Sequence, residues 1–204
     1  MYVEDNKNTL MGIVLAIIVC FSAVFSYDRF YMQPKENNAS TEIYLAEKKF
    51  EQNKFQEALD GDEQYAGLLE IIDSYSGTKT ANLAEYYAGI SYLRLGDAEA
   101  AIEHLDNFSS DDGILAPISK GAIGDAFSEL GQDEEALEYY IKAAELRTNN
   151  FTTPVYLMKA ANAAYSLGQK DKALSLYTRI ENEFATSSEG QNIGKYIARI
   201  TSAQ

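Results

Sequence analysis

The side chains best suited to catalysis or metal binding are scarce in this sequence, which holds one histidine, His104, and one cysteine, Cys20. An internal disulfide needs two cysteines, and a Cys or His metal site needs several ligands at short spacing. His104 falls in a repeated segment with no nucleophile motif beside it, so we expect an exposed or capping imidazole there. The sequence therefore predicts neither a disulfide nor a Cys or His metal site.

Common catalytic and phosphate-binding motifs are also missing from the sequence. It contains no paired-carboxylate motif, no phosphate-binding glycine loop and no Ser, His and Asp arrangement in a suitable context. The formal net charge of −14 disfavours nucleic-acid binding, which needs clustered Lys and Arg to release phosphate counterions. We therefore expect no enzyme, no cofactor, no small-molecule substrate and no nucleic-acid partner.

The positions that do recur in the sequence are structural. The stretches "SYLRLGDAEAAIEHL", "AFSELGQDEEALEYY" and "AAYSLGQKDKALSLY" share an aromatic residue, Leu-Gly, and an Ala five residues after the Gly. Their fixed points are Gly96, Gly131 and Gly168. Recurrence at this period predicts stacked helical hairpins, each with a glycine at the turn where a left-handed conformation carries no Cβ penalty.

These units resemble tetratricopeptide repeats. We place the three clear repeats at residues 82–116, 117–153 and 154–186, and the resemblance implies an all-α solenoid. Small residues stand where the two helices of a hairpin must approach closely, and these are Gly89, Gly124 and Ala161 in the first helices and Ala101, Ala136 and Ala173 in the second helices. The hydrophobic content of 46% and only three prolines agree with a packed helical body.

A degenerate copy precedes the clear repeats at residues 41–80. Asn53 stands in the glycine position and Ala58 keeps the five-residue offset, but six extra residues follow around "DGDEQY". We interpret these residues as a loop inserted into the second helix, either an ordinary surface insertion or a partner contact. Residues 187–204 place Ile193, Tyr196, Ile197 and Ile200 at helical spacing, which predicts a capping helix. The repeat domain is thus expected to cover residues 41–204.

Residues 9–27 form an uncharged stretch that would span roughly 28 Å as a helix, close to the hydrocarbon thickness of a bilayer. We expect a transmembrane anchor, with a cleaved signal peptide as the alternative. Val19 is too large for the residue that precedes a lipidated cysteine, so Cys20 is expected to be an apolar residue of the anchor. Residues 1–8 would be a short cytoplasmic terminus, and residues 28–40 a linker in which Pro34 ends any continuous helix.

The resemblance to tetratricopeptide repeats also implies a binding surface. In that family the first helices line a concave groove, and three positions of each first helix point into it. Carried over to this sequence, these are Tyr86, Ile90 and Leu93, then Gly121, Asp125 and Ser128, then Met158, Asn162 and Tyr165. None of the nine is Lys or Arg, which disfavours capture of an anionic chain terminus. Tyr86 and Leu93 could instead pack between repeats.

The order of anchor, degenerate repeat, three clear repeats and cap resembles a membrane-anchored tetratricopeptide family that accompanies the bacterial Sec translocon, especially its Bacteroidetes form. The closest likeness is carried by "NLAEYYAGISYLRLGD" and "LAPISKGAIGDAFSELGQ". The resemblance implies a single-pass inner-membrane protein with a periplasmic repeat domain. Its implied partners are the translocon and a translocating chain or periplasmic chaperone, to which it hands over new proteins.

Two observations from the residues leave alternatives to this resemblance open. Lys7 lies before the apolar segment, whereas Arg29 and Lys35 follow it, and this charge count slightly disfavours an outward-facing repeat domain. Similar repeats also serve many scaffolds, so the chain could belong to another envelope complex, in cell-wall synthesis, outer-membrane assembly, or secretion and gliding.

Overall fold

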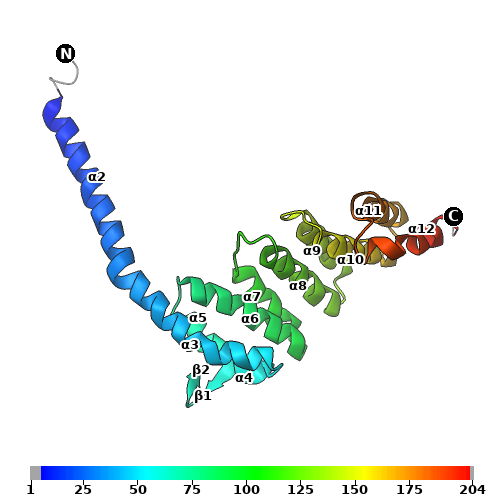
Figure 1. Ribbon diagram of the computed structural model, residues 1–204, viewed down its shortest axis with the longest axis horizontal. Helices are drawn as coiled ribbons and strands as arrows, with labels where there is room; N and C mark the ends of the chain where they lie inside the picture. Colours follow the sequence, from blue (N-terminus) through cyan, green and yellow to red (C-terminus); the bar gives the residue numbers. More distant parts are fainter. Residues whose placement is uncertain (1–5, 203–204) are drawn as a thin grey trace.

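A computed structural model describes residues 6–202 of the chain as a helical solenoid with one small β-hairpin, behind one long N-terminal helix (Figure 1). The N-terminal helix comprises α2 (Lys7–Tyr27), the π-helical turn η1 (Asp28–Met32) and α3 (Gln33–Glu51). The remaining elements, in chain order, are α4 (Phe55–Asp60), β1 (Gly61–Asp62), β2 (Tyr65–Ala66), α5 (Leu68–Ser74), α6 (Lys79–Leu95), α7 (Ala98–Asn107), α8 (Leu115–Glu129), α9 (Asp133–Glu145), α10 (Thr153–Ser166), α11 (Lys170–Glu183), η2 (Gly190–Asn192) and α12 (Ile193–Thr201).

The expectation that Pro34 ends the N-terminal helix is wrong. Proline lacks an N–H and crowds the carbonyl one turn before it, which would normally break an α-helix. Here Pro34 follows a π-helical turn, and the N–H of Gln33 bonds to the carbonyl of Asp28, five residues back. The wider turn accommodates the proline ring within a helix that runs on from α2 into α3.

Residues 28–40 are therefore not an independent linker, because their second half packs on the repeats. The Glu36 carboxylate accepts hydrogen bonds from the backbone N–H groups of Lys79 (2.6 Å) and Thr80 (3.2 Å) at the start of α6. Lys35 Nζ donates to the carbonyl of Ser76 (2.9 Å), and Ala39 is fully buried. A carboxylate at a helix N-terminus satisfies N–H groups that have no partner within the helix.

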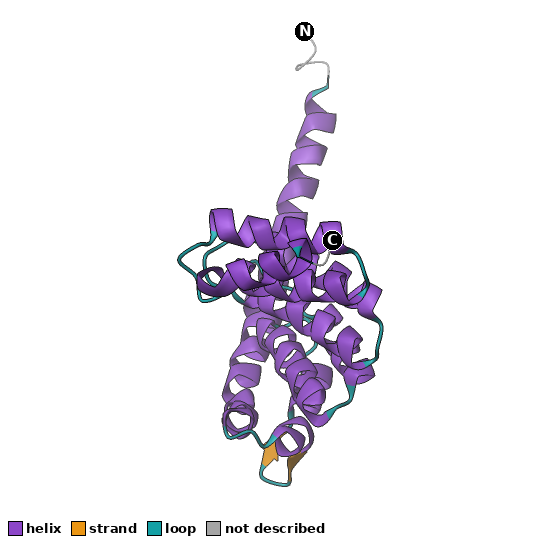
Figure 2. Ribbon diagram, turned by 90° about the vertical axis from the view of Figure 1, so that its right-hand side faces the viewer, coloured by secondary structure: helices purple, strands orange, loops and turns teal. Residues whose placement is uncertain are grey.

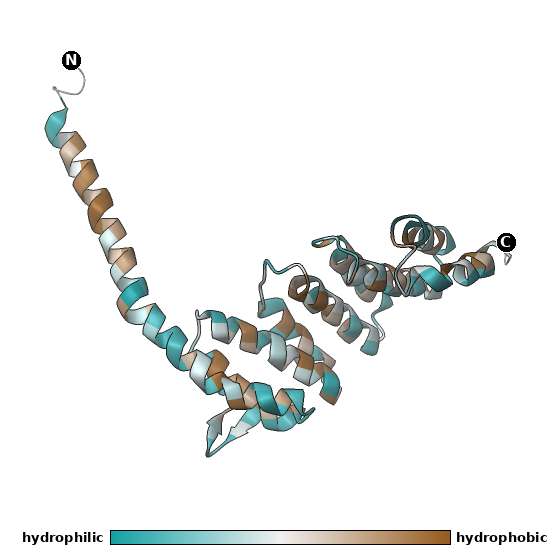
Figure 3. Ribbon diagram, viewed as in Figure 1, coloured by the Kyte–Doolittle hydropathy of each residue, from teal (hydrophilic) through white to brown (hydrophobic). Residues whose placement is uncertain are grey.

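Helix α2 is apolar and exposed along its length (Figure 3). The continuous helix is long and apolar enough to cross a membrane, with a mean hydropathy of 2.4 in its most apolar window and no buried residue there. A signal sequence has the same character. The predicted cytoplasmic terminus covers residues 1–8, of which residues 1–5 lie outside the described residues. Cys20 is exposed on the surface of α2.

The four turns inside the hairpins share one backbone geometry, as their recurring residues predict. Gly96, Gly131 and Gly168 have positive φ values of 83°, 70° and 74°, and Asn53 has 59°. After each turn residue, the next N–H bonds to a carbonyl five residues back, as Asp97 N does to Tyr92 O (3.0 Å). This bond satisfies a carbonyl at the end of the first helix. Asn53 can take the place of the glycine because asparagine adopts the left-handed region more readily than other non-glycine residues.

The close helix contacts within the hairpins also match the sequence pattern. A Cβ placed on Gly89 would lie 2.5 Å from the Leu105 side chain, and one on Gly124 would lie 2.7 Å from the Tyr140 ring. The second-helix positions Ala101, Ala136 and Ala173 are at most 1% exposed. The repeat register predicted from the sequence is therefore confirmed.

The insertion in the degenerate repeat is a β-hairpin rather than an irregular loop. Strands β1 and β2 pair in antiparallel register, Gly61 opposite Ala66 and Asp62 opposite Tyr65, and the backbone N–H of Gln64 bonds to Asp62 Oδ1 (2.7 Å). The hairpin divides the second helix into α4 and α5 and extends from the end of the molecule opposite α2 (Figure 2). Leu59 of α4 and Leu68 of α5 belong to one buried cluster, so the core of the repeat remains continuous across the insertion.

Helix α12 ends the solenoid as the predicted cap. Ile193 and Ile200 are 2% and 1% exposed and join the core of the last repeat. The described part of the cap includes a short 3-10 turn, η2, before α12 begins, and residues 203 and 204 lie outside the described residues.

Candidate protein-binding groove

A hollow of about 580 Å³ lies between the first helices of successive repeats. We call it the central groove. Five of the residues expected from the repeat pattern line it, namely Tyr86, Ile90, Leu93, Asp125 and Ser128. Residues that the pattern did not select complete the lining, namely Phe50, Arg94, Ile118, Ala122, Glu129, Tyr140 and Tyr156.

The apolar wall of the central groove comes from α6. Ile90 and Leu93 are half-buried and pack against a core cluster that contains Leu105 and Ile123. Tyr86 lies against Phe108, with ring centroids 5.3 Å apart, and burial raises the pKa of its phenol. These side chains therefore support the core with one side and face the hollow with the other, so packing and groove lining are not exclusive roles.

Two tyrosine rings form the floor of the groove because glycines leave room for them. A Cβ on Gly121 would lie 1.9 Å from the Tyr156 ring, just as a Cβ on Gly124 would meet Tyr140. Both rings are largely buried, at 8% and 6% exposure. Burial first, and then the charge of Asp125, raise the pKa of both phenols, so both stay protonated at neutral pH.

A charge pair crosses this floor. Asp125 accepts hydrogen bonds from the Tyr140 hydroxyl (2.8 Å) and from Lys159 Nζ (2.6 and 2.7 Å). The ammonium group also lies 5.5 Å from the centre of the Tyr140 ring and 5.9 Å from that of Tyr156. Lys159 thus neutralises the central carboxylate that the sequence pattern placed in the groove. The repeat pattern did not select Lys159, because this residue follows the predicted position Met158 by one residue. Its long side chain reaches back to Asp125 on α8.

The last three predicted positions do not line the central groove. Met158 packs against the core of the last repeat, Asn162 Oδ1 accepts a hydrogen bond from the Tyr177 hydroxyl (2.6 Å), and the Arg199 guanidinium lies 5.0 Å from the Tyr165 ring centre. Helix α12 covers this end and leaves a cavity of about 40 Å³. A role for these three residues in partner binding stays a prediction.

His104 has a structural role, because its side chain joins α7 to α6. Its Nδ1 lies 2.6 Å from Glu85 Oε2, and its ring stacks on Tyr92 with centroids 5.2 Å apart. The imidazole is half-buried between α6 and α7, in contrast to the exposed or capping imidazole expected. Across residues 6–202, no group of three or more His, Cys, Asp or Glu residues is placed to hold a metal ion.

The fold and groove define a helical-repeat protein of a kind that binds other proteins. The repeats match two family models, both described as tetratricopeptide repeat, one over residues 119–150 and the other over residues 83–111 and 156–187. The chain thus carries three tetratricopeptide repeats, as the sequence pattern predicts, and a protein-binding scaffold is the role that this fold supports.

The solved structures similar to this chain support the same fold. Two crystal structures of nearly identical TPR-like repeats, from a Podosopora anserina protein assigned as a kinesin light chain, match with a TM-score of 0.60. Sequence identity is 15%, and the match covers 82% of this chain and 87% of each of those chains. No curated protein matches this chain.

Proposed function

We propose that the protein is a membrane-anchored scaffold whose central groove binds segments of other proteins. The observation that carries this proposal is the open groove itself, with its apolar wall on α6 and its neutralised charge pair on α8 and α10. Such a lining suits a chain segment with apolar side chains, because Tyr, Ile and Leu surfaces bury large area and the polar floor can pair with a peptide backbone.

The membrane part of the proposal rests on α2. Its apolar surface is exposed in the folded chain, and helix η1–α3 joins it to the repeats without a flexible joint. Tyr27 and Tyr31 stack with ring centroids 5.2 Å apart just after the apolar stretch, where interfacial aromatic residues commonly lie. We propose that α2 remains in the mature protein as the anchor and that the repeats lie in the periplasm.

The setting we propose for the scaffold is the bacterial Sec translocon. This proposal is supported by a resemblance to the ancillary translocon family. The chain has the same order of elements as that family, and its first two clear repeats carry the closest likeness. In this setting the groove would receive translocated chains or a periplasmic chaperone and assist the handover between them.

Purification of the tagged full chain in mild detergent tests the setting. We expect translocon subunits to be recovered with it. Recovery of a wall-synthesis, outer-membrane or secretion complex in their place would overturn the translocon assignment and leave the groove as a binding site for another partner.

Truncation of two groove residues tests the groove. We expect Ile90→Ala with Leu93→Ala to weaken crosslinking of the partner by about fivefold or more, since truncating a binding hot spot costs over about 1 kcal/mol. The matched control is Ile141→Ala with Leu176→Ala, two similarly half-buried residues packed on the last core. Equal crosslinking by both double variants would show that the groove residues only pack.

A further inference from the structure

The loops between successive repeats lie along one edge of the solenoid, and that edge is held next to α2. Every first helix begins on the edge where α3 begins, because the hairpins stack with their first helices running in the same direction. The turns at Gly96, Gly131 and Gly168 lie on the opposite edge. In Figure 1 the α7–α8 and α9–α10 loops follow the side of the body toward which α2 projects.

Polar contacts join this edge into one unit with the N-terminal helix. Glu36 bonds to the start of α6, as described above, and Asn82 one turn later exchanges hydrogen bonds with the backbone of Ser109 (2.9 and 3.0 Å). The α7–α8 loop is in turn tied to the α9–α10 loop, because Arg147 pairs with Asp111 (2.8 Å). Glu36 itself lies only five residues after Tyr31, roughly 8 Å along the helix axis.

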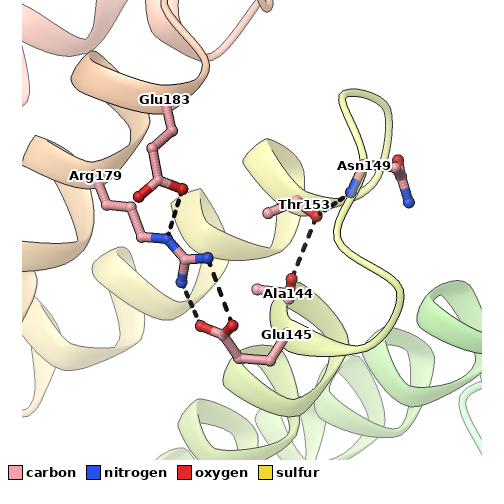
Figure 4. A network of polar contacts seen from close by, with 6 residues as sticks. All are labelled: Ala144, Glu145, Asn149, Thr153, Arg179 and Glu183. Atoms are coloured by element: carbon pink, nitrogen blue, oxygen red, sulfur yellow. Dashed lines mark hydrogen bonds and ion pairs between the residues drawn. The ribbon is translucent and has the colours of Figure 1, made fainter.

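The α9–α10 loop on this edge is built around Asn149. Its Oδ1 accepts hydrogen bonds from the backbone N–H groups of Phe151 and Thr152 (both 2.8 Å), and its Nδ2 donates to Gly113 O (3.0 Å). Figure 4 shows Thr153 Oγ1 between the N–H of Asn149 and the carbonyl of Ala144. Hydrogen bonds within the chain therefore brace this loop.

This well-bonded loop presents an apolar tip. Phe151 is 79% exposed, and Ile114 and Leu146 on the same edge are 40% and 37% exposed. Exposed apolar side chains that gather on one edge mark a candidate contact with an apolar partner. The sole cation within residues 108–114 and 146–152 is Arg147, which is already paired with Asp111.

We propose that this edge rests on the bilayer that holds α2, with Phe151 inserted at the boundary between headgroups and acyl chains and with Ile114 and Leu146 beside it. The inference rests on the proposed anchoring by α2. Its chemistry is apolar insertion, so the contact does not depend on anionic lipid. The repeat domain then lies along the membrane, and its hairpin β1–β2 faces away from the bilayer.

The sequence contains no tryptophan, so a single substitution supplies a unique fluorescent probe. We would prepare the full chain with Phe151→Trp in phosphatidylcholine vesicles that carry bromine near the top of the acyl chains. We expect a blue-shifted emission that the bromine quenches by about half, because apolar faces at the membrane interface are buried roughly 5–10 Å into this boundary. Adding an equal share of phosphatidylglycerol should leave the quenching unchanged.

The matched control is Leu130→Trp, which places the probe beside Gly131 on the opposite edge at an exposed position, 39% accessible in the parent chain. We expect its emission to stay red-shifted and unquenched. If the chain floats with the vesicles and both probes behave alike, the edge does not touch the membrane and the inference is overturned. If the chain does not float with the vesicles, the anchor itself is overturned, and this inference with it.

Discussion

The two ends of the repeat array treat equivalent positions of the repeat pattern in different ways. At the first and second clear repeats, Ile90, Leu93 and Asp125 line an open hollow of about 580 Å³. At the third, Asn162 and Tyr165 lie beside α12, with Tyr165 half-buried and Asn162 exposed, and a cavity of about 40 Å³ remains between them and the cap. Helix α12 packs where the first helix of a further repeat would lie. The role of a repeat position therefore depends on the element that follows it.

The largest effect on stability is expected at the closed end. Ile200→Ala should lower the free energy of unfolding by about 2–5 kcal/mol, because the side chain is 1% exposed and its loss leaves a cavity in the last core. Ile90→Ala, at a half-buried position in the open groove, should cost less than half as much. Chemical unfolding followed by circular dichroism measures both.

Equal losses from these two substitutions would mean that the open end is packed as tightly as the closed end. The comparison uses the same chemical change at both ends, so the difference reports how tightly each site is packed.

A second contrast uses one glycine from each end. Gly121→Ala places a Cβ 1.9 Å from the Tyr156 ring and should cost about 1–3 kcal/mol, because the ring has to leave the groove floor. Gly194→Ala in α12 meets nothing within 4 Å. It should stabilise the chain by up to about 0.5 kcal/mol through helix propensity, because Gly194 lies in the first turn of α12 and not in its interior. Melting temperatures that move in the same direction would contradict this account of the groove floor.

The sequence predicted the repeat register because the residues that determine it recur within every repeat. A glycine or asparagine at a left-handed turn, an alanine five residues later and a small residue in the first helix all recur, and each has a backbone or packing cause that needs no distant partner. Gly96, Ala101 and Gly89 are examples, and the structure places all three as the pattern indicates.

The features that the sequence did not predict depend on distant partners or on rare backbone geometry. Pro34 reads as a helix end unless the preceding turn is π-helical, and that turn leaves no clear mark on the residues. Lys159 reaches Asp125 beside the rings of Tyr140 and Tyr156, and Gly121 and Gly124 leave the room for those rings. The contact of α12 with Tyr165 depends on how the cap docks, which its apolar spacing alone does not determine.

The smallest expected effect concerns the two polar contacts that mark the open and the closed end. Asp125 and Lys159 have side chains 34% and 38% exposed, so water and salt screen their attraction. A double-mutant cycle with Asp125→Asn and Lys159→Met should give a coupling energy of about 0.2–1 kcal/mol that shrinks in high salt.

The corresponding bond at the closed end, from Tyr177 to Asn162, joins neutral groups. Tyr177→Phe should therefore cost about 0.5–1.5 kcal/mol at any salt concentration. A coupling of the charged pair that resisted salt would show that the groove is shielded from water in solution, and the open end would then resemble the closed one.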